Sequence, residues 1–233
     1  MPAIAACTVR RLGLVEYEQA WAEQKRLVEA SREGGEPHLL LLEHPPTYTL
    51  GVRGKNEHVL LADDALARLG AKVVRIDRGG DVTFHGPGQL VGYPIIDLGA
   101  WGQGPLWYVR SLEATLIQAL ARFGIDGQRV PGRPGVWVRG EKIASIGVHV
   151  SRGVTSHGFA LNVDPDLDYF SHIIPCGLPN VSVTSMARVL GDAPSMDDVM
   201  DAVADAFVDV FEIELVDGQR SVAPAAWAPT AAL

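Results

Sequence analysis

A twelve-residue stretch, residues 78–89 (RGGDVTFHGPGQ), constrains what this chain can fold into more than any other segment. It contains four glycines and one proline, and it lies between two apolar runs, residues 73–76 and 89–98, that are typical of β-strands. Glycine lets a backbone approach a ligand closely and present its N–H groups. A hairpin connection whose glycines only form turns is the alternative. Paired glycines between an arginine and a histidine favour a binding loop.

The rest of the chain has the composition of an ordinary globular protein, with 47% hydrophobic and 21% charged residues among 233. No linker or composition shift divides it, so we predict one catalytic domain over residues 1–233, with a loose C-terminal tail at about 220–233. No apolar run reaches the length of a membrane span, and the N-terminus lacks a secretory pattern. We therefore expect a cytoplasmic protein without membrane association.

Charge is distributed unevenly along the chain, whose net charge is −8. This acidic total argues against nucleic-acid binding. Residues 72–152 nevertheless hold 10 basic and 6 acidic residues, whereas residues 153–233 hold 2 basic and 12 acidic ones. An anionic substrate or an acidic partner protein could bind the central segment, although solvated helix faces would produce the same counts.

Strand-like runs arrive as hairpins with helical segments interspersed irregularly, which predicts an α+β fold with a mixed sheet flanked by helices. The spacing predicts helices at residues 14–33, 63–69 and 105–123, and two more that begin after Ser182 and after Ser195. It predicts strands at residues 38–43, 47–51, 73–76, 89–98, 136–138, 142–150 and 157–163.

Cys176 is the candidate nucleophile of the two cysteines in the chain. Pro175 constrains the backbone before it, and Gly177 leaves one flank of the sulfur open. A helix beginning after Ser182 would favour a thiolate nearby. The alternative is a small buried hydrophobic residue, which is how most free cysteines behave. Cys7 has no comparable setting, and we interpret it as structural. Two cysteines are also too few for a disulfide framework or a cysteine-based zinc site, so we expect no metal.

Lys142 is a candidate base for that thiol. On a strand it has the same parity as Ala144, Ile146 and Val148, which places its amine at the edge of an apolar face. Desolvation there would lower its pKa and let it exchange protons. A turn lysine that points into water is the alternative, and the spacing from Cys176 does not decide between them.

Small residues alternate along two of the predicted strands. Ser145 and Gly147 share one side of the first strand, and Gly158, Ala160 and Asn162 share one side of the second. Such residues leave a groove in which an aliphatic chain could lie, although a closely packed helix would use the same residues.

Four motifs in this order resemble those of the lipoyl(octanoyl) transferases, the octanoyl-acyl-carrier-protein:protein N-octanoyltransferases of lipoate biosynthesis. They are residues 78–90 with Tyr93-Pro94 (RGGDVTFHGPGQL…YP), residues 142–147 (KIASIG), residues 157–162 (HGFALN) and residues 175–177 (PCG). The resemblance covers the chain from about its first helix to its last. It implies the fold of the biotin and lipoate protein ligases.

The resemblance also implies a two-step acyl transfer without ATP or any other cofactor. Cys176 would take octanoyl from octanoyl-acyl-carrier protein as a thioester, and a lysine of a lipoyl domain would then take it as an amide. Lys142 would move the protons. The acceptors would be lipoyl domains of 2-oxoacid dehydrogenases and the glycine cleavage H protein. The residues implied to bind the acyl group are Arg78, Gly79, Gly80, Asp81, Val82, Thr83, Phe84, His85, Ser145, Ile146, Gly147, Gly158, Phe159 and Ala160.

Three alternatives share much of this pattern. One is an ATP-dependent lipoate or biotin protein ligase on the same fold. The second is an amidotransferase that moves octanoyl between lipoyl domains. The third, from another class, is an acyl-binding module without chemistry, which would need neither Cys176 nor Lys142.

Overall fold

The computed structural model describes residues 6–174 and 182–217 of the 233. Cys176 with its neighbours Pro175 and Gly177, and the tail predicted at about 220–233, lie outside the described residues.

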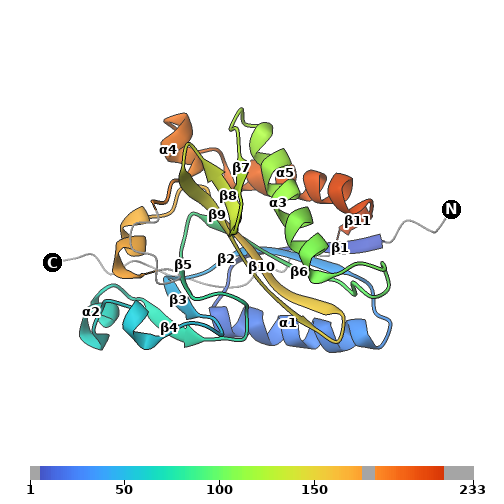
Figure 1. The fold of residues 1–233 in the computed structure, drawn as a ribbon, viewed down its shortest axis with the longest axis horizontal. Helices are drawn as coiled ribbons and strands as arrows, with labels where there is room; N and C mark the ends of the chain where they lie inside the picture. The colour runs from blue at the N-terminus through green and yellow to red at the C-terminus, as the bar shows by residue number, and fades with distance from the viewer. Residues whose placement is uncertain (1–5, 175–181, 218–233) are drawn as a thin grey trace.

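An eight-stranded mixed sheet forms the centre of the molecule, in the order β11-β1-β2-β6-β10-β9-β8-β7. β1 runs parallel to β2 and to β11, and the remaining neighbours are antiparallel. The mixed sheet flanked by helices that the sequence predicts is confirmed (Figure 1). The strands are β1 Ala6–Leu14, β2 His38–Glu43, β6 Gln89–Ile95, β7 Gln128–Val130, β8 Arg133–Val138, β9 Glu141–Ser151, β10 Val154–Asn162 and β11 Glu214–Asp217.

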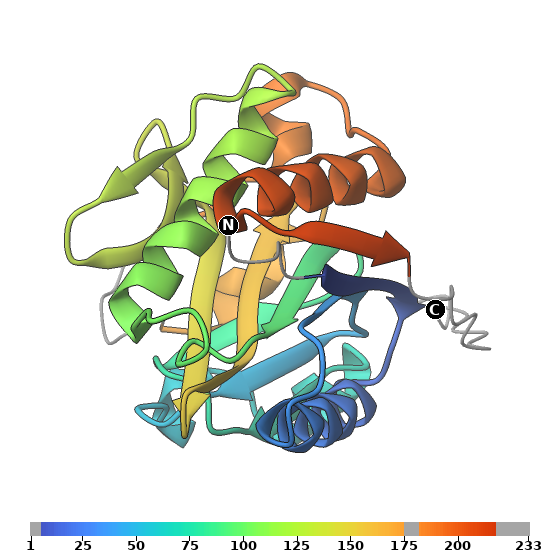
Figure 2. The same ribbon diagram turned by 90° about the vertical axis from the view of Figure 1, so that its right-hand side faces the viewer.

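Helices cover both faces of this sheet, with α1 on one face and α3 and α5 on the other (Figure 2). The run of four leucines in β2 explains how one strand serves both layers. Leu39 and Leu41 pack in the cluster with α3 and α5, whereas Leu40 and Leu42 pack against α1. A strand buried on both faces needs such a continuous apolar run.

The helices agree with the predicted ones except at two ends. Ser195 caps α5, because its hydroxyl accepts from the Asp198 N–H at 3.1 Å. Ser182 does not cap α4, whose cap is Ser185. Leu14 ends β1 and is not helical. The helices are α1 Tyr17–Arg32, α2 Asp63–Arg68, α3 Pro105–Ala121, α4 Met186–Leu190 and α5 Met196–Phe211, with 3-10 turns η1 Asn56–His58 and η2 Leu167–His172.

A second, three-stranded sheet packs beside the first and changes the interpretation of the glycine-rich stretch. Its order is β4-β3-β5, with β3 Thr47–Leu50, β4 Lys72–Arg75 and β5 Val82–His85. Residues 82–85 were expected to belong to a continuous loop, but they form β5. Phe84 faces the core of this sheet, stacked on Tyr169 at 4.5 Å between ring centroids. Four-residue strands carry too little periodicity to be distinguished from a loop.

Three strands of the large sheet, β1, β7 and β11, were not predicted. β7 and β11 contain three and four residues, too few for an alternation to be recognised, and β11 pairs with β1, which was not predicted either. Among the described residues, no helix is both long and apolar enough to cross a bilayer.

Candidate active site

A cavity of about 770 Å³ lies between the large sheet, the small sheet and η2. Its walls come from β9 and β10, from residues 78–83 with His85, and from Phe170 and Ile173. β5, β9 and β10 come together near the centre of Figure 1. A volume of this size is within the roughly 300–1,000 Å³ range of small-molecule sites.

The structure brings nearly all of the sequence-predicted site residues to this one cavity. Of the predicted residues that the structure describes, Lys142 is on the wall and Phe84 is the exception, because it packs in the core of the small sheet. The other predicted residues on the wall are Arg78, Gly79, Gly80, Asp81, Val82, Thr83, His85, Ser145, Ile146, Gly147, Gly158, Phe159 and Ala160.

Arg78 fastens the glycine-rich loop to both sheets. Its guanidinium donates to the Thr49 carbonyl at 2.7 Å and to the Thr49 hydroxyl at 2.9 Å, and the N–H of Gly79 donates to Val148 O at 2.8 Å. The Arg78 stem crosses Gly147 so closely that a Cβ there would lie 2.9 Å from Arg78 Cδ. Gly147 is therefore needed for the approach of the loop to β9.

Lys142 is half-buried and lies opposite Trp137, its register partner on β8. Its Nζ is 5.6 Å from the centroid of the Trp137 ring, a distance suited to a cation–π contact. Gly135 passes so close that a Cβ there would lie 2.8 Å from Lys142 Cε. Gly135 also has φ +121°, which disfavours any side chain. The predicted position at the edge of an apolar wall agrees with this geometry.

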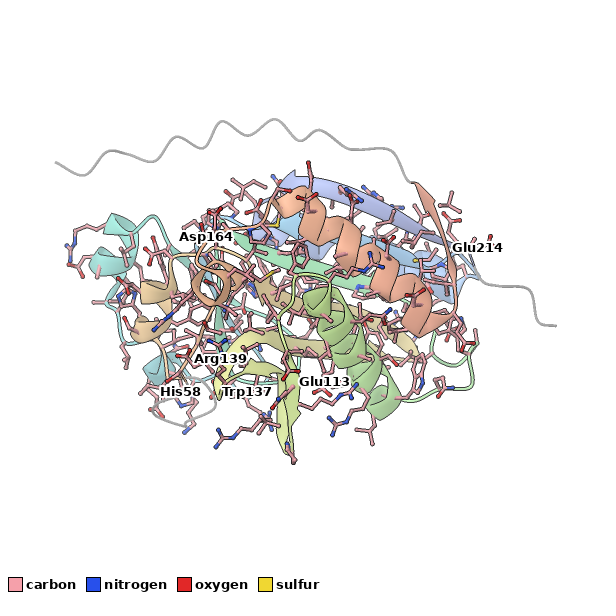
Figure 3. All side chains as sticks on the ribbon, turned by 90° about the horizontal axis from the view of Figure 1, so that it is seen from above. His58, Glu113, Trp137, Arg139, Asp164 and Glu214 are labelled. Carbon is pink, nitrogen blue, oxygen red and sulfur yellow. The ribbon has the colours of Figure 1, made fainter. Side chains whose placement is uncertain are left out.

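A buried carboxylate braces the β7–β8 hairpin that supplies this wall. Glu113 on α3 is 1% exposed and accepts from Arg110 at 2.7 Å, from Arg129 at 3.0 Å and from the N–H of Gly135 at 3.2 Å. Figure 3 shows Glu113 between α3 and this hairpin. Glu113 thus holds the backbone that packs against the Lys142 side chain.

A chain of buried hydrogen bonds reaches the backbone of Lys142 from the small sheet. His85 Nδ1 donates to Gln89 at 2.8 Å, Gln89 donates to Asn162 at 2.9 Å, and Asn162 donates to the Thr184 carbonyl at 2.9 Å. The Thr184 N–H donates to Lys142 O at 3.0 Å. Burial, with smaller contributions from His44 and Arg78, holds the pKa of His85 well below its usual range. His85 is therefore a neutral donor.

Further polar groups line the cavity near α1. His157 has φ +55° and is 1% exposed, and its Nε2 donates to Asp77 at 2.8 Å. The hydrogen bond from His157 lowers the pKa of Asp77 to about 2, whereas burial lowers the pKa of His157. Both shifts describe a neutral imidazole that donates to an ionised carboxylate. Tyr17, 3.4 Å from His157 Nδ1, completes this wall.

His44, next to this cluster, predicts how stability depends on pH. It is fully buried between the Val15 carbonyl and the Tyr93 hydroxyl, and burial lowers its pKa from 6.5 to about 4. The unfolded chain binds a proton at the His44 imidazole more readily than the folded chain does. The stabilisation of the folded state by neutral His44 is therefore complete above pH 6.5 and is lost as pH falls towards 4. We expect the free energy of unfolding in urea to fall by about 2 kcal/mol or more between pH 7.5 and 5.

Substitution of His44 by Asn should remove its share of this pH dependence and leave that of the buried His85 and His157. Substitution of the partly exposed His149 by Asn should preserve the dependence. Carboxylates with lowered pKa values, such as Asp77, change the free energy of unfolding only at lower pH. The change between pH 7.5 and 5 therefore comes from the buried histidines. Equal wild-type stability at pH 7.5 and 5 would contradict the assignment.

Of the two cysteines, the structure describes Cys7 and not Cys176. Cys7 is 0% exposed in the core, and burial raises the pKa of its thiol to about 12, which makes it a poor nucleophile. Cys176 lies outside the described residues. Ile173 and Val183, on either side of it in sequence, both line the cavity.

Several wall residues escaped sequence reasoning. Tyr93 and His157 lie inside the quoted motifs, so they could have been predicted as site residues. The others lie in segments without a motif. They include Tyr17, Arg53, Lys55, His58, Arg133, Trp137, Phe170, Ile173 and Val183. In residues 6–174 and 182–217, no group of three or more His, Cys, Asp or Glu side chains is arranged to hold a metal ion.

Comparison with known proteins identifies the family. Residues 16–208 match the lipoyl protein ligase A/B catalytic domain. An octanoyltransferase from Solibacter usitatus is 49% identical over 213 residues, covering 91% of this chain and 96% of the relative. The chain belongs to the octanoyltransferase family. A further octanoyltransferase, from Chloroflexus aggregans, is 49% identical and covers 90% of this chain and 97% of the relative. This family member is an enzyme of the transferase class.

Solved structures show that this octanoyltransferase family member has the predicted ligase-like fold. A lipoate-protein ligase A bound with ATP superposes with a TM-score of 0.74 at 17% identity, covering 92% of this chain and 88% of the other. A bipartite lipoate protein ligase from Thermoplasma acidophilum gives 0.73 at 16% identity, covering 92% and 87%. At such identities the likeness concerns the fold alone.

Proposed function

We propose that this protein transfers an octanoyl group from octanoyl-acyl-carrier protein, through a thioester on Cys176, to a lysine of a lipoyl domain. The observation that carries the proposal is the convergence of Lys142 and thirteen motif residues on one cavity. The relatives named octanoyltransferase support the acyl group, and the lipoyl protein ligase A/B match supports the acceptor.

In the first step the sulfur of Cys176 attacks the carbonyl carbon of the donor thioester. Lys142 accepts the thiol proton, and the bond from that carbon to the carrier's sulfur breaks. The carrier leaves as a thiol once it takes the proton back. One thioester replaces another, so this step is nearly neutral in free energy and needs no nucleotide. A lysine can serve here because its amine exchanges a proton once it is partly desolvated.

In the second step the neutral amine of the acceptor lysine attacks the carbonyl of the acyl-enzyme. Lys142 removes a proton from that nitrogen, the bond to the Cys176 sulfur breaks, and the thiolate is reprotonated. An amide replaces a thioester, so this step is downhill. The acyl chain would lie along Ser145, Gly147 and Ala160, where small side chains leave the space that the cavity occupies.

The position of Lys142 favours this chemistry over simple acyl binding. Lys142 packs at the wall against Trp137 and Gly135, and its backbone bonds to Thr184. Glu113 accepts a hydrogen bond from Gly135, and Asn162 donates one to Thr184, so these neighbours are themselves fixed. An acyl-binding module without chemistry would have no use for a lysine at this place on the wall. The arrangement matches a group that must reach two successive reaction partners.

The proposal predicts octanoyl transfer without nucleotide. Incubation with octanoyl-carrier protein alone should increase the intact mass of the enzyme by one octanoyl group. Addition of an apo lipoyl domain should then remove that mass and place it on the domain. The full rate should be reached without ATP, because the thioester already activates the acyl group.

Two results would redirect the proposal. A strict requirement for ATP would place the protein with the adenylating ligases whose fold it shares. Acylation by an octanoylated lipoyl domain, but not by octanoyl-carrier protein, would make it an amidotransferase.

A further inference from the structure

Three exposed cations line the cavity, and we call them the basic rim. Arg53 and Lys55 lie on the loop between β3 and η1, and Arg133 begins β8. All three line the cavity, and their side chains are also exposed, which places them where the cavity opens to solvent. His58 and Trp137, wall residues close to them in sequence, lie on the same side of the molecule in Figure 3.

The two arginines of the basic rim lack the carboxylate partner that half of the arginines in this chain have. Among the side chains that the structure describes, no Asp or Glu forms an ion pair with Arg53 or Arg133. Arg133 instead lies 5.8 Å from the centroid of the Trp137 ring. By contrast, eight arginines are paired with carboxylates: Arg10, Arg11, Arg26, Arg32, Arg68, Arg110, Arg122 and Arg129.

A chain with a net charge of −8 has an excess of carboxylates with which to neutralise its arginines. Cations left without carboxylates at the mouth of a cavity therefore attract an anion from outside. Of the three cations, Lys55 alone has a carboxylate partner among the described side chains, Glu57 at 3.2 Å. Both side chains of that pair are mostly exposed, so the pair is weak and easily exchanged.

We infer that the basic rim binds the phosphate of the phosphopantetheine arm that carries the donor's acyl group. The inference rests on the proposed function, and it names the residues that select the donor. Guanidinium groups bind phosphate through paired, charge-assisted hydrogen bonds. Arg53 follows β3 of the small sheet and Arg133 begins β8 of the large sheet, so segments of both sheets bring a guanidinium to the cavity that the arm must enter.

The acceptor fits the basic rim poorly. Its reacting group is a lysine amine, which is a cation in neutral water, and like charges at the mouth disfavour its approach. The donor brings the opposite charge on the arm that must enter. The rim therefore acts in acylation of the enzyme and not in transfer to the lipoyl domain.

Two small thioesters that differ by one phosphate test this inference. Octanoyl-pantetheine and octanoyl-phosphopantetheine are each mixed with the enzyme, and acylation of Cys176 is followed by intact mass in single turnovers. The wild type should react about tenfold faster with the phosphorylated thioester at limiting concentration. In the double variant Arg53→Gln/Arg133→Gln this ratio should fall to about one, and the salt dependence of acylation by octanoyl-carrier protein should weaken.

Arg152→Gln is the matched control, because Arg152 also lacks a carboxylate partner among the described residues but does not line the cavity. It should keep the wild-type ratio. A wild type that treats the two thioesters alike would overturn the inference, and so would a double variant slowed only in transfer to the lipoyl domain. Failure of the wild type to be acylated by either thioester or by octanoyl-carrier protein would instead overturn the proposed function, and the rim's role with it.

Discussion

Substitution of Cys176 by alanine is expected to abolish octanoyl transfer, with a loss of at least about a thousandfold in rate. The reason is chemical. Without the sulfur there is no acyl-enzyme, and the acceptor amine would have to attack the donor directly. The measurement is intact mass after incubation with octanoyl-carrier protein, which should show no added octanoyl group, together with transfer to a lipoyl domain.

Cys7→Ala is the matched control for this variant. Cys7 is buried in the core, and its thiol pKa is raised to about 12 by burial, so it should play no part in the chemistry. We expect activity near that of the wild type and at most a small loss of thermal stability. A dead Cys7 variant beside an active Cys176 variant would show that the nucleophile has been assigned to the wrong cysteine.

Lys142→Arg is expected to be nearly as damaging as Lys142→Ala, with a loss of roughly a hundredfold or more. Arginine keeps a positive charge that could favour a thiolate, but it cannot release a proton at any accessible pH. A lysine that only supplies a static field would be replaced well by arginine. A lysine that moves protons between thiol and amine would not.

Single-turnover acylation of Cys176 and, separately, its deacylation by a lipoyl domain should be followed across pH for both variants. A proton shuttle predicts that both half-reactions slow. Because Gly135 packs against Cε of Lys142, the larger guanidinium also meets a fixed backbone, and thermal unfolding of each variant checks that the fold is retained. Most of the activity surviving in Lys142→Arg, in both half-reactions, would leave Lys142 with an electrostatic role only.

Much of the candidate site could be predicted because its residues stand in short contiguous motifs. Ser145 and Gly147 on one strand and Gly158 and Ala160 on the next were expected to leave a groove. The register pairs Ser145 with Ala160 and Gly147 with Gly158 beside the cavity. Alternation along a strand is a local property, so the sequence is enough to assign faces. The helices and the longer strands were predictable for the same reason.

The buried polar network could not be predicted. His85, Gln89, Asn162 and Thr184 are spread over a hundred residues, and no local pattern says that they form one chain of hydrogen bonds ending at Lys142. Their contact depends on β5, a four-residue strand that periodicity could not distinguish from a loop. Phe84 shows the same limit, because it shares a motif with wall residues but faces the core of the small sheet.

The sequence by itself therefore determined the family, the mixed sheet with its helices, and the candidate nucleophile and base. Each of these depends on contiguous residues or on their local spacing. Only the tertiary structure decided which groups meet across long separations: the brace from Glu113 to Gly135, and the basic rim that joins Arg53 to Arg133. Such meetings depend on how two sheets pack together, and packing is a property of the whole chain that no single segment encodes.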